Sequence, residues 1–433
     1  MKNATLRVIL VILISVLIGY YFGVNKVTLD WKNYKPSLSI INKQPPPVLS
    51  NVDFSVFWMV WESLENKFYD KNKLDPQQML NGAIVGLTQS LGDPYTVYLP
   101  PQQNNNFKQG LAGQFSGIGA ELGIADEQVI VIAPLNGSPA EKAGVKAQDA
   151  IVKVDGVSTN GWSVSQAVEK IRGPKGTEVI LSLVHKNTKK SEDVKIIRDI
   201  ITVKSVEGWV KKIKYQKSNI KNEIQILEED QKCDDCPKVA YIRLSQFGDQ
   251  TNKEWTYLVN SLSLQIEKNP SAGSGQGVKG LILDLRNNPG GYLSDAVFIA
   301  SEFLNVGKTV VLEEGHDNKK NLLVTRKGLL TSINLVILIN KGSASASEIV
   351  AGAMMDNNRA TLIGETSFGK GSIQMADDLP NGAGLHITIA KWLTPKGNWV
   401  NGKGLKPDIE VKLDDKDPTH DLQLEKAVEE LIE

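Results

Sequence analysis

Four uninterrupted apolar runs in the second half of the chain limit its fold more than any other feature. The runs are VAYIRLS (239–245), KGLILDLR (279–286), NLVILIN (334–340) and ATLIG (360–364). Strands with apolar residues on both faces are typical of parallel sheets that helices cover on both sides. Stretches with helical spacing of apolar residues alternate with the runs, at 252–268, 294–304 and 347–355. The sequence therefore predicts an α/β core that begins at Val239.

The length and the changes of pattern along the chain predict several folded units. The chain has 433 residues, which is too long for one ordinary core. We expect a multidomain α+β protein with a cytoplasmic stub (1–7), a transmembrane anchor (8–24), a proline-containing linker (25–50), a helical region (51–105), a small, mostly β module (106–203), a charged insertion or flexible hairpin (204–238), the α/β core (239–414) and a C-terminal helix (415–433). Lysine plus arginine and aspartate plus glutamate both total 49, so the net charge favours no nucleic-acid partner.

The N-terminus predicts attachment to a membrane. The uncharged run at 8–24 would reach roughly 25 Å as a helix, the short end of a membrane span. Lys2 and Arg7 precede it and favour a cytoplasmic N-terminus. A cleaved signal peptide is the alternative, but no A-x-A-like cleavage site follows the run. We therefore expect a retained single-pass anchor with the bulk of the chain outside the cytoplasm, in the periplasm or at the cell exterior.

The helical region carries two amphipathic patterns between about residues 53 and 91. Asp75-Pro76 is a helix start signal and Gly92 a stop signal. The aromatic stripe of the first pattern suits packing in a core or contact with a second copy in a homodimer.

The two cysteines predict a small disulfide rather than a metal centre. Cys233 and Cys236 lie in KCDDCP, and the four histidines are scattered without forming a ligand pair. A structural zinc site needs four ligands. We expect a disulfide that clamps a loop in an oxidising compartment, and no metal or other cofactor.

The segment GETSFGKGSIQ (364–374) nearly matches a nucleotide-binding P-loop, but its context excludes one. Gly364, Gly369 and Lys370 fit the pattern, whereas Gly371 stands where the magnesium-binding hydroxyl belongs. A P-loop must open a helix. Here two alternating stretches around a Pro-Asn-Gly turn follow, which predicts a β-hairpin, so a P-loop ATPase is disfavoured.

Three serines precede the predicted helix at 347–355 and are candidate nucleophiles. Ser343, Ser345 and Ser347 would lie at a strand-to-helix corner, where helix amides can stabilise an oxyanion. Equally, they can be helix caps and packing residues. No histidine lies in these segments, so the expected base is Lys370, because burial lowers the pKa of a lysine. Gln374 is placed to orient the amine.

With LILDLRNNPGG (281–291) and KWLTPKGNWVNGKGLKPDI (391–409), these segments resemble the C-terminal processing peptidases, also called tail-specific proteases. The resemblance runs in order over 51–433. It implies a ClpP/crotonase-like serine protease core that uses a Ser-Lys dyad. By motif position, it assigns Ser345 as nucleophile, Lys370 as general base and Gln374 as the residue that orients the lysine. It also implies an oxyanion hole made of backbone amides, at Gly290 or Gly291 and at Ala346.

The same resemblance identifies the β module at 106–203 as a PDZ domain. QFSGIGAEL (114–122) is similar to a carboxylate-binding loop, and SVSQAVEKIRG (163–173) to the helix on the other side of the peptide groove. A substrate tail would add to the module as a strand. The implied tail-binding residues are Gly117, Ile118, Gly119, Ala120, Val164, Val168 and Ile171. Arg172 matches an arginine that couples the PDZ module to the active site.

The expected function is therefore a membrane-anchored serine endopeptidase that cuts proteins near their free C-termini. The competing interpretation is a catalytically silent PDZ scaffold that captures protein tails at the membrane. The presence of both Ser345 and Lys370 favours the enzyme.

Overall fold

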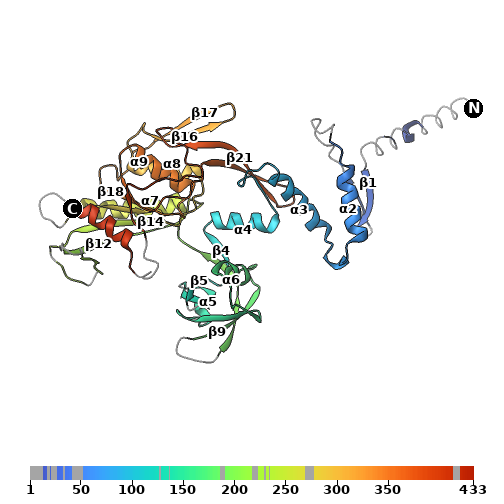
Figure 1. Cartoon of the computed structure of the whole chain (residues 1–433), viewed down its shortest axis with the longest axis horizontal. Helices are drawn as coiled ribbons and strands as arrows, with labels where there is room; N and C mark the ends of the chain where they lie inside the picture. Colours follow the sequence, from blue (N-terminus) through green and yellow to red (C-terminus); the bar gives the residue numbers. More distant parts are fainter. Residues whose placement is uncertain are drawn as a thin grey trace, which may run out of the picture. The chain divides into compact units, whose positions relative to one another are not determined.

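The computed structural model describes residues 13–16, 20, 27–32, 35–40, 52–125, 128–135, 137–185, 191–216, 223–228, 231–233, 235–268, 277–412 and 420–433. The chain divides into two compact units, residues 1–79 and 80–433. Figure 1 shows the elements of both.

The first unit contains a strand pair and short helices. Strands β1 (Val27–Lys32) and β2 (Lys35–Ile40) pair antiparallel inside the predicted linker. Prolines 45–47 lie outside the described residues. Helix α2 (Ser55–Lys67), the 3-10 turn η2 (Lys71–Lys73) and the start of α3 (Pro76–Gln89) follow, which agrees with the two predicted helices.

Most of the predicted anchor at 8–24 lies outside the described residues. Among the helices that the structure does describe, none has the length and apolarity needed to cross a membrane.

The predicted PDZ module in the second unit is built on one antiparallel sheet. Its strand order is β10 (Ser191–Ile197), β9 (Glu178–Val184), β7 (Ala150–Val154), β6 (Gln128–Pro134) and β5 (Ala120–Ala125), with β8 (Val157–Ser158) beside β7. Helices α5 (Pro139–Lys142) and α6 (Val164–Ile171) complete the module. Two further strands, β4 (Gln114–Gly117) and β11 (Asp199–Thr202), pair with each other where the chain enters and leaves it.

The α/β core contains a seven-stranded sheet. The order is β13 (Glu223–Ile226), β12 (Val206–Gln216), β14 (Lys238–Leu244), β15 (Val278–Asp284), β18 (Leu335–Ile339), β19 (Thr361–Gly364) and β22 (Ile409–Glu410), parallel from β14 onward. The continuous apolar runs have the expected cause, because alternate residues face opposite sides of a strand. Leu281 and Leu283 belong to the core that includes α7 (Thr251–Lys268), α8 (Leu293–Phe303) and α9 (Ala346–Asp356), whereas Ile282 packs with α10 (Leu422–Ile432).

A second sheet lies in the same unit and includes the strand that follows Lys370. Its order is β17 (Lys319–Leu323), β16 (Thr309–Gly315), β21 (Gly384–Leu393) and β20 (Ser372–Asp378), and β3 (Val97–Leu99) also pairs with β21. Strands β20 and β21 form the predicted hairpin after Lys370. Helix α4 (Pro101–Leu111), which crosses the predicted domain boundary at 105, attaches to this hairpin through Lys108, whose amine lies 2.6 Å from Asp378 Oδ1.

Residues 206–216 correct the sequence-based boundary at 204–238. This stretch forms β12, which pairs with β14 and is part of the seven-stranded sheet rather than an insertion. Lysines separate its apolar residues, among them the buried Val206 and Ile213, and so hide the strand pattern. The hairpin alternative agrees with the pairing of β12 and β13. Cys233 and Cys236 form the expected disulfide in the loop before β14.

Candidate active site

The corner between β18 and α9 distinguishes the three serines. The buried Ser343 hydroxyl donates to Leu285 O (2.8 Å) and accepts the Asn340 N–H (3.0 Å). The buried Ser347 hydroxyl donates to Asn288 O (2.8 Å). These two serines therefore hold the corner in place. Ser345 is half-buried and lines a pocket of about 320 Å³.

The backbone of Ser345 is strained. Its φ of 55° and ψ of −116° lie in a region that side chains with a Cβ rarely adopt. Strain of this kind persists only where surrounding contacts impose it, and it is concentrated at functional sites. A sharp strand-to-helix turn with a strained serine is how several hydrolases expose a nucleophile.

The Pro-Gly-Gly turn lies directly against Ser345. A Cβ added to Gly290 would lie 2.8 Å from Ser345 Cβ, so only glycine allows this approach. The Gly290 N–H donates to Asn288 Oδ1 (2.9 Å). Of the two predicted turn amides, Gly291 is therefore the better oxyanion donor. Ala346 is the first residue of α9, where helix amides have no intrahelical acceptor.

Lys370 reaches the same pocket from the loop between β19 and β20. Burial is the largest influence and lowers the pKa of its amine, against the opposing charges of Asp93 and Glu348. Among the residues that the structure describes, no carboxylate lies within ion-pairing distance of this amine. The amine lies 5.0 Å from the ring centroid of Tyr95, which precedes β3. Sequence reasoning missed Tyr95, because only the fold brings it to Lys370.

Glu348 is a second residue that the sequence did not reveal. It is fully buried on the first turn of α9. One oxygen, Oε2, accepts the backbone N–H groups of Ser345 (2.8 Å) and Lys370 (2.9 Å). The other, Oε1, accepts the Gly369 N–H (2.7 Å) and the Ser367 hydroxyl (2.6 Å). One carboxylate thus fixes the loop of the candidate base to the corner of the candidate nucleophile. Its position three residues after Ser345 was the only available signal.

Gln374 lines the pocket, but its hydrogen bonds lie elsewhere. Its Nε2 donates to Ser372 Oγ (2.7 Å) and Thr388 Oγ1 (3.4 Å). An orienting bond to the Lys370 amine is absent among the described contacts. His386 also lines the pocket, with its ring centroid 4.4 Å from that of Phe107. Burial, with a smaller contribution from Lys370, lowers the pKa of this histidine.

The PDZ module presents an edge strand beside a helix. Strand β5 ends the sheet order, and α6 packs against it. Gly117 is the last residue of β4 and Ala120 the first of β5, and Gly119 between them has a φ of 75°. The side chains of Ile118 and Ile171 are buried in the core of the PDZ module. Val164 and Val168 on α6 are half-exposed, so they are the predicted apolar contacts that a bound tail could reach.

Arg172 ends α6 and contacts the strand pair that joins the PDZ module to the core. Its guanidinium carbon lies 4.8 Å from the ring centroid of Phe115 on β4, and burial lowers its pKa. The contact thus joins α6 to the strand pair through which the chain enters and leaves the PDZ module.

The fold and the pocket define a PDZ-containing serine-type peptidase. Comparison with known proteins gives the same class. Residues 238–411 match the model of peptidase family S41 and residues 130–184 that of the PDZ domain. The chain is 37% identical over 355 residues to the carboxy-terminal processing protease CtpA of Bacillus subtilis, covering 82% of this chain and 68% of that protein.

A second relative is the "Probable CtpA-like serine protease" of Staphylococcus aureus strain COL, with 36% identity over 403 residues, 92% of this chain and 72% of that protein. The chain therefore belongs to peptidase family S41. A crystal structure of an S41-type protein from Bacteroides fragilis shares the fold at a TM-score of 0.52 and 15% identity, covering 86% of this chain and 96% of that one.

Proposed function

We propose that this protein is a serine endopeptidase that cleaves polypeptides near their C-termini with a Ser345–Lys370 dyad. The observation that carries the proposal is the single pocket that Ser345, Lys370, Gly291 and Ala346 line together. The processing activity in the names of its relatives supports the choice of substrate.

The proposed reaction begins with the neutral amine of Lys370. It accepts the proton of the Ser345 hydroxyl as Oγ attacks the scissile carbonyl carbon. The amides of Gly291 and Ala346 stabilise the oxyanion. The lysine ammonium then gives its proton to the leaving amine as the C–N bond breaks, leaving an acyl-enzyme. Water, deprotonated by the same lysine, releases the acyl group.

The PDZ module supplies the preference for chain ends in this proposal. A substrate tail adds to the edge of β5 beside α6, with its carboxylate at the amides of Ile118, Gly119 and Ala120 and its apolar side chains against Val164 and Val168. The glycines Gly117 and Gly119 permit the close approach of the carboxylate. Through its contact with Phe115, Arg172 would relay tail binding toward the core.

Mass spectrometry of cleavage products tests the dyad and the tail preference together. Paired peptides with free or amidated C-termini are incubated with wild type, Ser345→Ala and Ser332→Ala, the last being an exposed serine outside the pocket. We expect cleavage of the free-ended peptide by wild type and Ser332→Ala, and binding without cleavage by Ser345→Ala. Undiminished proteolysis by Ser345→Ala would refute the dyad. Equal cleavage of both peptides would refute tail recognition.

We also propose that residues 8–24 anchor the protein with its catalytic part outside the cytoplasm. The apolar run and the Cys233–Cys236 disulfide support this location, because disulfides persist in oxidising compartments. A C-terminal reporter that is active only after export should be active when fused to the full chain. An inactive but intact fusion would contradict the proposed topology.

The first unit is a candidate for contact between two copies. Met59, Val60, Leu64 and Phe68 line an exposed hollow of about 530 Å³ on α2. Exposed apolar patches of this kind mark interaction sites. Sedimentation should show a dimer for the wild type and a monomer for Met59→Glu. Identical masses would remove this proposal.

A further inference from the structure

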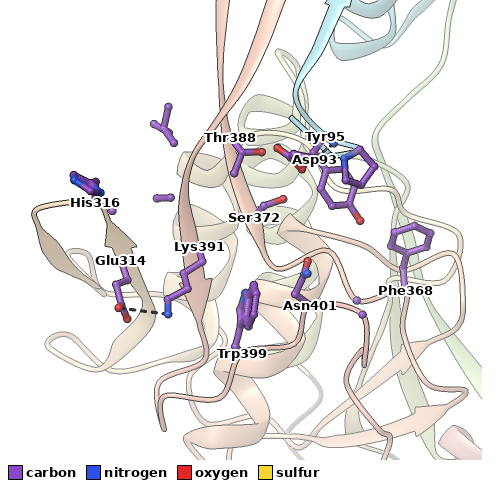
Figure 2. A pocket seen from close by; sticks show the side chains of 17 residues that line it. Asp93, Tyr95, Glu314, His316, Phe368, Ser372, Thr388, Lys391, Trp399 and Asn401 are labelled. Atoms are coloured by element: carbon purple, nitrogen blue, oxygen red, sulfur yellow. Dashed lines mark hydrogen bonds and ion pairs between the residues drawn. The ribbon is translucent and has the colours of Figure 1, made fainter. Parts of the chain in front are cut away.

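A second hollow adjoins the candidate catalytic pocket. It has a volume of about 780 Å³, and β21 and the loops next to it supply lining residues. Figure 2 shows these side chains, with Thr388 and Lys391 among them. Gly369 and Ser372, which flank Lys370 along the chain, line it, and Ser372 lines the catalytic pocket as well. The two concavities therefore share a wall at Ser372, in the segment that carries the candidate base.

Part of the wall of the second hollow consists of large, exposed apolar side chains. Phe368, Ile389 and Trp399 line it with 56%, 45% and 48% of their surfaces exposed. Large apolar side chains gathered in one concavity are typical of a binding site. At the rim, the Lys391 amine lies 3.4 Å from Glu314 Oε1, so these opposite charges offset each other. The part of the lining formed by Phe368, Ile389 and Trp399 therefore favours an apolar group.

Hydrogen bonds to the catalytic loop fix this surface. Trp399 Nε1 donates to Gly371 O (2.9 Å), and the Phe368 N–H donates to Ser343 O (3.0 Å). Trp399 is thus bonded to the residue after Lys370, and Phe368, two residues before Lys370, is bonded to the serine corner. A ligand in the hollow contacts the loop that presents the candidate base.

The direction of the substrate identifies the occupant. The catalytic pocket also has walls from Phe107 and Leu111 of α4, which leads directly into β4 and the PDZ module. In the proposed function the PDZ module holds the C-terminus, so the α4 side receives the part of the substrate that follows the cut. The second hollow, at the Lys370 side, is left for the part that precedes it.

We propose that the second hollow is a subsite for a large apolar side chain of the polypeptide substrate, on the N-terminal side of the scissile bond. This inference rests on the proposed function and adds a sequence preference to it. Phe368, Ile389 and Trp399 are its specificity-determining residues.

Peptide pairs that differ in one residue test the subsite on the full chain. After the cut is mapped, each position on its N-terminal side carries either Phe or Ser, with the free C-terminal tail unchanged. Wild type should favour Phe by about tenfold or more in kcat/KM at one position. The variants Phe368→Ser and Ile389→Thr should each lower that ratio several-fold. Tyr257→Ala, which removes an exposed aromatic side chain from α7 outside the hollow, should leave the ratio unchanged.

The ratio within one enzyme corrects for any general loss of folding or rate. An unchanged ratio in both hollow variants overturns the subsite. So does a change of sedimentation mass in Phe368→Ser at an unchanged ratio, because the surface would then serve contact between two copies. Ser345→Ala is assayed in parallel. Continued cleavage by Ser345→Ala would defeat the proposed dyad. If Ser345→Ala is inactive and the Phe/Ser ratios of Phe368→Ser and Ile389→Thr equal that of wild type, only the subsite is defeated.

Discussion

Replacement of Glu348 by glutamine tests whether one buried carboxylate holds the two reacting residues in place. Its Oε2 accepts the N–H groups of Ser345 and Lys370, and its Oε1 accepts the Gly369 N–H and the Ser367 hydroxyl. Glutamine has almost the same size but carries one oxygen and one NH₂ group. In either orientation of the amide, the NH₂ group faces groups that also donate.

The cost follows from the less unfavourable orientation. With the NH₂ group toward Gly369 and Ser367, the serine hydroxyl can rotate and accept, whereas the Gly369 N–H loses its acceptor. An unpaired buried N–H costs about 1–3 kcal/mol, and the remaining bonds lose their ionic contribution. We expect Glu348→Gln to lower the free energy of unfolding by about 2–4 kcal/mol. We expect kcat to fall by about 10²-fold, because a displacement of roughly 1 Å at the reacting groups has that effect.

The matched control is Glu302→Gln. Glu302 is a buried carboxylate outside the pocket that accepts Trp255 Nε1 (3.2 Å) and Arg326 Nη2 (2.9 Å). Equilibrium denaturation should show a loss of stability in both variants. Only Glu348→Gln should lose kcat, measured at a temperature where both are folded. A destabilised Glu348→Gln that keeps the wild-type kcat would show that Glu348 does not position the reacting residues.

Three further outcomes follow from the pocket. Because burial lowers the pKa of Lys370 and only the neutral amine acts as base, kcat/KM should rise with pH through an acidic limb below pH 10.5, and a rate that falls as this limb is crossed would refute the lysine base. Tyr95→Leu should reduce kcat by about 2- to 30-fold and move the acidic limb to lower pH, because the ring favours the ammonium form of Lys370. Tyr95→Phe keeps the ring and should restore both values. Equal defects in the two variants would refute the ring contact. His386→Gln should retain kcat within about tenfold, whereas a loss of 10³-fold or more would make the histidine the base.

Local patterns were sufficient to predict most of the catalytic fold. Leu281 to Leu283 and Leu335 to Ile339 read as buried strands because both faces of the sheet are covered. The turn after Lys370 predicted the β20–β21 hairpin. Strand β12 could not be predicted in this way, because lysines interrupt its apolar pattern and because Val206 is buried where β12 pairs with the distant β14.

The site was predicted only in part, and long-range contacts account for the rest. Spacing treats Ser343, Ser345 and Ser347 alike, and only the tertiary bonds of the outer two leave the middle one for the pocket. Glu348 reads as an ordinary helix-start residue, since its contact with Lys370 depends on how the β19–β20 loop folds back. Tyr95 reaches the amine from the other end of the chain.

The arrangement around Lys370 would resolve a conflict between two requirements of the proposed lysine base. The amine must be neutral before the reaction, yet a carboxylate is needed nearby to fix its loop. Four protein donors occupy the two oxygens of Glu348, so its charge acts on the amine without a direct ion pair, and burial remains the larger influence on the pKa. In the proposed reaction, once the amine has taken the serine proton, the charges of Asp93 and Glu348 and the face of Tyr95 all favour the ammonium. In this proposal burial favours the neutral amine that must be present before the reaction, and the surrounding charges and ring stabilise the ammonium that the reaction forms.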